Sequence, residues 1–418
     1  MKKIFHFLKQ ILYYLKRGLL CFLKKALHVI IKTPYYIKTS FRCVKEGFLF
    51  FAAAAVIVTV AFGSLLNAGK ETSPRYGDDL PPAPTFTFES YLNGRFQQSG
   101  EQYLAGQIWP RDLLTMTHSL ADFLLFKNES HGIAYGRGGY TFRIFYDFDV
   151  DTLMANLNAI DSFAYHTVSN VSVMIVPTAN YVLKDYLPAG LPDVDQNYYI
   201  SEFYRYWGDS VATTINVADA LAVEAIRADS YLYYRTDPHW TSYGAWLAYS
   251  QLMAVRGQSL FPYDARAALR STGFLGANYA ASKALFPRAD EIAYFDFAAD
   301  ITFPAERGKP VTMNSLYDDE QFAERNQYAA FLYGDHARAE ITSQQSSNKL
   351  DTIVVICDSF GYSFIPFLTQ NYNHIIMIDP RYYDGSFEEL RGTHYDDVLI
   401  LMSFESICTD ASFAKLNG

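Results

Sequence analysis

Cysteine is scarce in this sequence: the 418 residues include four, which are Cys21, Cys43, Cys357 and Cys408. No two of them form a CxxC pair, and none stands near histidines at a spacing typical of zinc sites, so the sequence predicts no metal site. Cys357 ends an apolar run that we interpret as a buried strand, and such a position favours a packed free thiol. A disulfide between Cys357 and Cys408 is the alternative.

Positive charge does not cluster beyond position 46. Residues 1–46 hold eleven Lys or Arg and one acid, Glu46, which makes about +10. Since the whole chain carries −9, residues 47–418 carry −19. Phosphate binding needs clustered cations, so this acidic part is not expected to bind nucleic acid.

Glycine-rich phosphate loops and internal repeats are also lacking. Residues 131–142, HGIAYGRGGYTF, hold four glycines, but they lack the GxGxxG order and a following helix. We interpret this stretch as a β-hairpin and expect no dinucleotide or other cofactor. No solenoid period stands out, and no low-complexity tract occurs outside residues 67–85.

One long hydrophobic run is present. Residues 47–66, GFLFFAAAAVIVTVAFGSLL, contain no charge and are long enough to span a hydrocarbon core, so we predict a single transmembrane helix. The basic flank predicts that residues 1–46 stay in the cytoplasm and that the chain after Leu66 lies outside. A cleaved signal sequence is the alternative, although the run begins late and follows a long basic segment.

The predicted helix separates three other parts of the chain. Residues 1–46 interleave apolar residues with Lys at helical spacing, which predicts either an amphipathic segment on the inner leaflet or a topology signal with no further role. Residues 67–85, rich in Pro, Gly, Ser and Asp, are predicted to be a linker. Residues 86–418 form the predicted extracytoplasmic domain, which starts with a helical stretch, 86–125, broken at Trp109-Pro110.

Apolar β-forming runs alternate with helical patterns in this domain. A helix is expected from Asp151 to about Val168, between the preceding hairpin and a buried strand. The expected strands are 171–176, 352–357, 374–378 and 398–402. Strands separated by helical regions predict an α/β domain with a parallel sheet flanked by helices. In such sheets ligands bind and catalytic residues lie at the carboxyl ends of the strands.

The stretch Leu350–Leu368, LDTIVVICDSFGYSFIPFL, carries the first candidate site residue. Ser359 follows a predicted strand and precedes a helix expected from Gly361 to about Gln370. Free N–H groups at a helix N-terminus favour a developing negative charge, and Gly361 permits a tight turn that a Cβ would obstruct. Ser359 is therefore a candidate nucleophile, and a purely structural turn is the alternative.

A second constellation lies in residues 233–248, YYRTDPHWTSYGAWLA. Asp237 and His239 flank Pro238, whose fixed φ favours a turn, and a helix is expected directly afterwards. A carboxylate two residues from an imidazole can accept one ring N–H and leave the other nitrogen free as a base. With Ser359, these residues supply the nucleophile, base and orienting acid of acyl transfer. A turn whose histidine satisfies local carbonyls is the alternative.

The segments TDPHWT, residues 236–241, and DSFG, residues 358–361, together resemble the DHHW proteins. More distantly they resemble the alginate O-acetyltransferases of the AlgX and AlgJ type, within the SGNH hydrolase superfamily. Other stretches that fit the family pattern are Trp109–Asp112, Gly132–Phe142, Ile175–Thr178, Phe274–Gly276, Phe331–His336 and Ile378–Tyr383. The resemblance thus covers about residues 86–410.

This resemblance implies an SGNH-hydrolase-like fold with Ser359 as nucleophile, His239 as general base and Asp237 as its orienting partner. It implies neither a cofactor nor a metal. A metal cluster that joins Asp335-His336 to the Asp237–His239 pair is the alternative, because carboxylate and imidazole are ligand types.

The sequence departs from the family pattern at three positions. Pro238 stands in the middle of the D-H-H-W signature, which leaves the D-x-H pair intact. The family often has a basic residue before the D-S pair and an Asn three residues after its Ser, where this chain has Cys357 and Tyr362. If that Asn helps to bind an oxyanion, Tyr362 or the backbone N–H groups of Ser359 and Phe360 must replace it.

The resemblance implies a membrane-anchored O-acetyltransferase or acetylesterase that modifies a cell-surface polysaccharide. An exported domain has no cytosolic acetyl-CoA, so the resemblance also implies a membrane-bound O-acyltransferase partner that supplies the acyl group. The alternative is a non-catalytic glycan-binding or assembly scaffold of an exopolysaccharide export or acetylation machinery. Tyr362 in place of Asn is the feature that favours this alternative.

Overall fold

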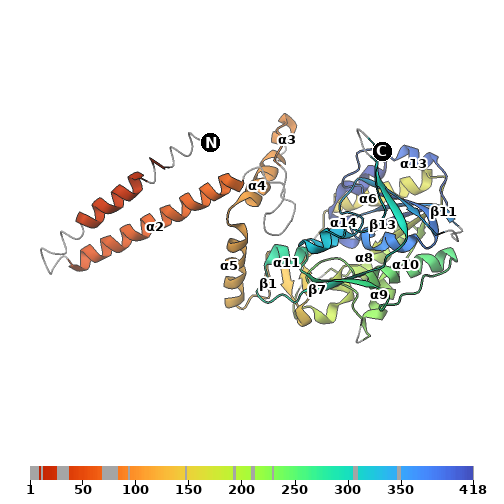
Figure 1. Cartoon of the computed structure of the whole chain (residues 1–418). Helices are drawn as coiled ribbons and strands as arrows, with labels where there is room; N and C mark the ends of the chain where they lie inside the picture. Colours follow the sequence, from red (N-terminus) through yellow and green to blue (C-terminus); the bar gives the residue numbers. More distant parts are fainter. Residues whose placement is uncertain are drawn as a thin grey trace. The chain divides into compact units, whose positions relative to one another are not determined.

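The computed structural model describes most of the chain. The described residues are 9–10, 13–25, 37–67, 83–92, 95–145, 148–191, 194–208, 212–227, 230–304, 309–345 and 350–417. The chain divides into two units, of which the first comprises residues 1–73 with 79–114 and the second residues 74–78 with 115–418 (Figure 1).

The described part of the first unit is mostly helical. Residues 9–10 and 13–25 are helical. They are followed by α2 (Ile37–Asn67), α3 (Phe88–Leu92) and α4 (Arg95–Gln107), and α5 (Arg111–Leu124) begins at the end of the unit. The break expected within residues 86–125 therefore falls at Trp109-Pro110, because proline lacks the backbone donor that a helix interior uses. Trp109 N–H donates instead to Ser64 Oγ, at 3.0 Å.

The amphipathic segment, the transmembrane helix and the linker stay predictions. Of the amphipathic segment 1–46, residues 9–10, 13–25 and 37–46 are described and are helical, whereas most of the predicted linker 67–85 lies outside the described residues. In the part of the chain that the structure describes, no helix combines the length and apolar composition needed to cross a membrane. The transmembrane helix expected at residues 47–66 stays a prediction.

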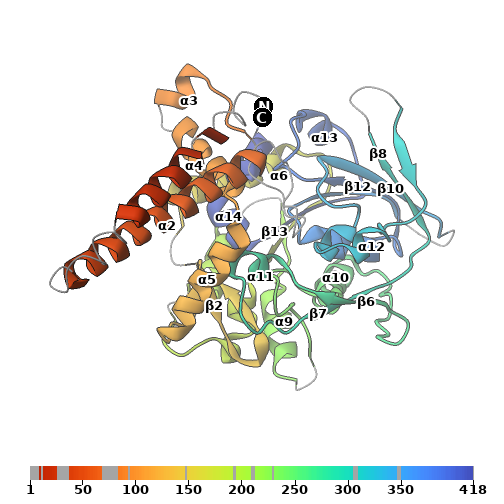
Figure 2. The ribbon, with the colours of Figure 1, turned by 60° about the vertical axis from the view of Figure 1, so that its left-hand side comes forward.

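The second unit is an α/β fold built on a mixed, mostly parallel sheet (Figure 2). Its strands are β4 (Val171–Val176), β5 (Thr213–Thr214), β8 (Ala299–Phe303), β9 (Val311–Met313), β10 (Arg338–Ser343), β11 (Leu350–Cys357), β12 (Tyr372–Ile378) and β13 (Asp397–Ser403). Their spatial order is β5-β4-β13-β11-β12-β10-β8-β9. The first five are parallel, and the last three continue the sheet in antiparallel pairs. The four strands expected from the sequence are confirmed, and the antiparallel extension adds to the predicted parallel sheet.

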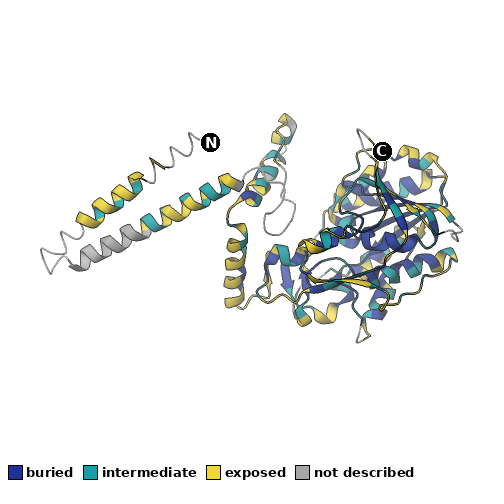
Figure 3. Cartoon of the chain, in the orientation of Figure 1, coloured by how far each residue is buried: buried dark blue, intermediate teal, exposed yellow. Residues whose placement is uncertain are grey.

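The central strands are buried on both faces, which explains their continuous apolar runs. In β11, Ile353, Val355 and Cys357 belong to one hydrophobic core, and Val354 and Ile356 belong to the other. This alternation follows from the period of two along a strand. The dark blue residues of Figure 3 show this buried core around the sheet.

Helices cover both faces of the sheet. The core on one face includes residues of α10 (Ser242–Arg256) and α12 (Gly361–Leu368). The core on the other includes residues of α6 (Val150–His166), α8 (Gln196–Tyr206) and α14 (Phe404–Thr409). The helices expected near residues 151–168, after Thr241 and after Gly361 are thereby confirmed.

Shorter elements complete the unit. They are β1 (Glu129–Ser130), β2 (Ile133–Tyr135), η2 (Arg137–Gly139), β3 (Thr141–Arg143), α7 (Ala179–Val182), η3 (Lys184–Tyr186), α9 (Ala218–Ala225), β6 (Leu269–Phe274), α11 (Ala277–Ser282), β7 (Asp290–Tyr294), η4 (Gln321–Ala323), η5 (Gln327–Ala330), α13 (Glu388–Gly392) and η6 (Ala411–Asn417). β2 pairs antiparallel with β3, which confirms the hairpin expected at residues 131–142.

Candidate active site

Ser359 lies in the turn between β11 and α12, at the carboxyl end of the central strand, and it is half-buried. Gly361 begins α12 directly behind it. A Cβ at Gly361 would come within 2.7 Å of Cys357 Cβ and still closer to the Cys357 sulfur. A turn this tight against the strand end therefore requires glycine at position 361.

His239 lies in a short loop closed by the β-bridge between Tyr233 and Trp240. The buried carboxylate of Asp290 shapes this loop, because its two oxygens accept the backbone N–H groups of Arg235 and Thr236, both at 2.8 Å. Asp290 also accepts the Thr236 hydroxyl at 2.6 Å. The loop that carries His239 is thus fixed to β7 before any substrate binds.

The structure brings the three predicted site residues together. His239 Nδ1 lies 2.6 Å from Asp237 Oδ1, and His239 Nε2 lies 2.8 Å from Ser359 Oγ. Because an ionised carboxylate only accepts, the Nδ1–H must donate to Asp237, and Nε2 is left to accept the Ser359 hydroxyl proton. Two motifs that are distant in the sequence thus meet in the structure, and the catalytic roles of their residues stay a prediction.

Asp237 is held as a carboxylate. Burial by itself raises its pKa, but the positive charge of a protonated His239 and the hydrogen bonds from His239 and the Ala277 N–H outweigh this effect, so that the pKa lies below its ordinary value of 3.8. Ala277 N–H donates to Oδ2 at 2.9 Å, and His239 N–H donates to Oδ1 at 3.0 Å. Both oxygens are thus oriented, and the imidazole is oriented in turn.

Gly276 explains one of the family-like stretches. A Cβ at this position would come within 2.6 Å of Asp237 Cγ, so only glycine lets the backbone of α11 approach the carboxylate this closely. The approach places the Ala277 N–H on Asp237 Oδ2. The Phe274-Leu275-Gly276 segment is therefore part of the support of Asp237.

Tyr328 is a site residue that the sequence did not reveal. Its ring stacks on the His239 imidazole, with centroids 4.0 Å apart and planes 9° from parallel. Its hydroxyl donates to the Ser359 carbonyl at 2.9 Å. Trp240 Nε1–H donates to the neighbouring Phe360 carbonyl at 3.1 Å. The two aromatic residues thus hold the serine turn against the histidine loop.

Asp358 holds the same turn from the other side. Its Oδ1 accepts the Phe360 N–H at 3.0 Å, and its Oδ2 accepts the Ser403 N–H at 2.8 Å and the Ser406 hydroxyl at 2.7 Å. The side chain is almost fully buried. Asp358 therefore links the turn after β11 to the end of β13, a role that its place beside Ser359 did not disclose.

Two of the three alternative oxyanion donors bind other groups. The Tyr362 hydroxyl donates to Asp379 Oδ2 at 2.7 Å and lies 2.9 Å from Asp335 Oδ1. The Phe360 N–H donates to Asp358. The third alternative donor is the Ser359 N–H. Among the described residues it has no hydrogen-bond acceptor, so it is free to bind an oxyanion.

The metal alternative finds no support in the geometry. His336 Nε2 lies 2.9 Å from the Tyr333 carbonyl oxygen, and Asp335 binds Tyr362 and Tyr382 rather than His239. Within the residues that the structure covers, no group of three potential ligands is placed to hold a metal ion.

The prediction that Cys357 is a packed free thiol is confirmed. Cys357 and Cys408 are free and buried, on opposite faces of the sheet. Burial raises the pKa of the Cys357 thiol well above its ordinary value, so this thiol beside the site is a packing group.

The protein thus has an α/β fold in which a serine at the carboxyl end of a central parallel strand meets a histidine and an aspartate from a separate loop. The family described as DHHW protein matches residues 126–378, which is more than half of the chain. The chain therefore belongs to the DHHW family, and the resemblance expected from its motifs is confirmed.

Two of the solved structures that match this chain have TM-scores above 0.5 and share its fold. A DHHW family protein from Eubacterium siraeum DSM 15702 is similar over 69% of this chain and 96% of its own, with 19% identity and a TM-score of 0.56. Bacillus cereus PatB1 with a sulfonyl adduct is similar over 67% of this chain and 97% of its own, with 17% identity and a TM-score of 0.51. The O-acetyltransferase domain of Pseudomonas putida AlgJ matches over 68% and 98%, with 16% identity and a TM-score of 0.42. No curated protein matches the sequence.

Proposed function

We propose that the protein is a serine-dependent O-acetyltransferase or acetylesterase that acts on a cell-surface polysaccharide. The observation that carries the proposal is the continuous chain of hydrogen bonds from Asp237 through His239 to Ser359, with distances of 2.6 and 2.8 Å. A serine is activated when a base lies within hydrogen-bond distance of its hydroxyl and a carboxylate orients that base.

The reaction would proceed in two halves. His239 Nε2 takes the Ser359 proton as Oγ attacks the acyl carbonyl, and the Ser359 N–H donates to the developing oxyanion. His239 then gives the proton to the leaving oxygen, which leaves an acyl group on Ser359. A sugar hydroxyl or water, deprotonated by His239, attacks that ester and restores Ser359. Asp237 stabilises the imidazolium at both stages.

The three side chains by themselves support only acyl transfer. That the acyl group is acetyl and that the acceptor is a polysaccharide is inferred from the family resemblance of the DPHW and DSFG segments. We further propose the membrane anchor at residues 47–66, with residues 86–418 outside the cell. A membrane-bound O-acyltransferase would then supply the acyl group. The uncharged run and its basic flank support this placement.

Replacement of Ser359 tests the enzyme proposal. We expect Ser359→Ala in the full chain to lower kcat/KM for 4-nitrophenyl acetate by at least about a thousandfold, because the nucleophile is removed. Ser201→Ala, at an exposed position of α8, is the matched control and should retain wild-type rates. Wild-type rates in Ser359→Ala would remove Ser359 from the mechanism.

A non-catalytic glycan scaffold is the second candidate. The engagement of Tyr362 by Asp335 and Asp379 favours it, because no side chain then replaces the family's Asn near the serine. A fluorophosphonate probe separates the two candidates. An active serine should be labelled in the wild type and not in His239→Ala, whereas a scaffold should remain unlabelled while still binding polysaccharide.

A further inference from the structure

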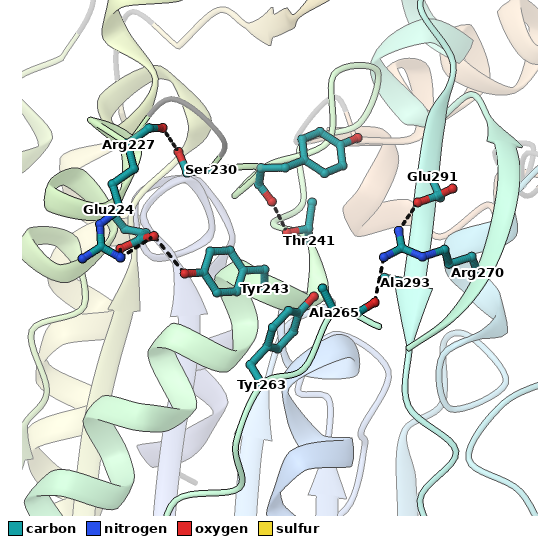
Figure 4. A pocket seen from close by; sticks show the side chains of 11 residues that line it. Glu224, Arg227, Ser230, Thr241, Tyr243, Tyr263, Ala265, Arg270, Glu291 and Ala293 are labelled. Atoms are coloured by element: carbon teal, nitrogen blue, oxygen red, sulfur yellow. Dashed lines mark hydrogen bonds and ion pairs between the residues drawn. The ribbon is translucent and has the colours of Figure 1, made fainter. Parts of the chain in front are cut away.

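A cavity lies beside the loop that carries His239. It measures about 620 Å³, is open to the surface, and is bordered by the ends of α9 and α10, the chain near residue 263, and the β6–β7 hairpin. This volume is within the range of small-molecule sites. None of Asp237, His239 and Ser359 lines it. Figure 4 shows Glu224, Arg227 and Tyr243 on one side, and Arg270 and Glu291 on the other.

Two tyrosine rings line the middle of this cavity. Tyr243 and Tyr263 have ring centroids 4.9 Å apart, with planes at 51°. Trp246 stacks against Tyr243 at 5.9 Å and 10°, and its indole N–H donates to the Phe261 carbonyl at 2.8 Å. The rings are thus held in place before a ligand arrives, which lowers the entropy cost of binding.

Charged pairs form the walls. On one side Arg227 lies 2.9 Å from Glu224, whose Oε1 accepts the Tyr243 hydroxyl at 2.8 Å. On the other side Arg270 pairs with Glu291, and its Nη2 donates to the Ala265 carbonyl at 2.8 Å. Two guanidinium groups and two carboxylates sum to no net charge. The walls therefore offer both hydrogen-bond donors and acceptors without a field of one sign.

We propose that this cavity binds a neutral pyranose oligomer as a second glycan site, distinct from the site at Ser359. A pyranose ring has a C–H face that can pack on a tyrosine ring and hydroxyls at its edge that pair with carboxylate and guanidinium groups. An anion would meet Glu224 and Glu291, and a purely apolar ligand would bury four charged groups without new partners. A neutral, polyhydroxylated ring avoids both costs.

The cavity and the serine site share one structural element. Tyr231 and Thr241 line the cavity, and the Thr241 hydroxyl donates to the Tyr231 carbonyl at 2.5 Å. The loop between these residues carries Asp237 and His239. A glycan held here would thus be retained next to the reacting loop, and this part of the inference rests on the proposed function.

Titration calorimetry of the full chain tests the site. The probes are maltohexaose, cellohexaose, laminarihexaose and chitohexaose, added to the Ser359→Ala protein so that no turnover interferes. We expect at least one to bind at a single site, and Tyr263→Ala to weaken that Kd about tenfold through loss of the ring contact. Tyr263→Phe keeps the ring and should bind as the parent does. Tyr165→Ala, at an exposed tyrosine of α6, should also leave Kd unchanged.

A second variant guards against misfolding. Arg270 is exposed, so Arg270→Ala should keep the thermal midpoint of the parent while Kd rises. Failure of all four hexasaccharides to bind, or an unchanged Kd in both Tyr263→Ala and Arg270→Ala, would overturn the inference. Hydrolysis of 4-nitrophenyl acetate separates it from the proposed function, because hydrolysis without sugar binding defeats only the second site, and sugar binding without hydrolysis defeats only the enzyme.

Discussion

Asp237 shows how single residues prepare this site. Burial of a carboxylate alone would favour its protonated form, yet both oxygens accept N–H groups, from His239 and from Ala277. The close approach of Gly276 makes the second of these bonds possible. The side chain is therefore ionised and fixed, which an orienting partner of a general base requires.

The lowered pKa of Asp237 predicts a pH dependence of stability. Its folded-state pKa lies below the ordinary 3.8, so the folded protein releases this proton more readily than the unfolded chain does. The resulting stabilisation is complete above about pH 4 and is lost as the pH falls through the folded-state pKa. We expect the free energy of unfolding, measured in urea, to fall less between pH 6 and pH 3 in Asp237→Asn than in the wild type.

The control for this experiment is Asp384→Asn, because the Asp384 side chain is 97% exposed. It should show the wild-type difference between the two pH values. An Asp237→Asn protein with the same pH dependence as this control would mean that Asp237 is not held as described.

At the scale of elements, the turn from β11 into α12 decides where Ser359 points. Gly361→Ala would place a methyl group against the Cys357 side chain, so we expect the free energy of unfolding to fall by about 1–3 kcal/mol. The same overlap should displace Ser359 and lower the rate of ester hydrolysis. Chemical denaturation and 4-nitrophenyl acetate assays measure the two effects.

Two comparisons make the Gly361 prediction specific. Gly392→Ala, in α13 with no atom within 4 Å of the added Cβ, should leave both quantities close to wild type. Addition of Cys357→Ala to Gly361→Ala should recover part of the stability, because it removes the overlapping sulfur. A fully stable and active Gly361→Ala protein would refute the packing argument.

The sequence predicted the elements whose signal is local. β4, β11 and β13 each contain a run of at least four apolar residues, and the helix after Gly361 follows a turn that needs glycine. β10 gave no such signal, since its buried Ala339 and Ile341 alternate with polar residues over only six positions, and its pairing with β12 depends on contacts distant in sequence. Short alternations of this kind occur in many loops.

The candidate site divides in the same way. Asp237, His239 and Ser359 stand in compact motifs whose residue types suggest their chemistry. Tyr328 stands in a short 3₁₀ segment with no motif, and its stacking on His239 arises only when the chain folds. Its place in the sequence made Tyr362 one of the alternative oxyanion donors, but the carboxylates of Asp335 and Asp379 bind its hydroxyl.

At the scale of the whole molecule, the membrane anchor proposed at residues 47–66 follows a basic segment, 1–46, and precedes an acidic remainder of the chain. We expect the full chain to remain in the membrane fraction after an alkaline carbonate wash, because an uncharged run of this length partitions into lipid. Deletion of residues 47–66 should release it. Replacement of those residues by an unrelated transmembrane sequence should restore retention, and a full chain that the wash extracts would contradict the anchor.

An acylated serine is the most direct consequence of the geometry at the strand ends. The full chain should be mixed with 4-nitrophenyl acetate, quenched in acid within the first turnover, digested and analysed by mass spectrometry. We expect the mass of one acetyl group on the peptide that contains Ser359, and none on that peptide in the Ser359→Ala and His239→Ala proteins. Acetylation at another residue, or hydrolysis without any acetyl group on Ser359, would contradict the account.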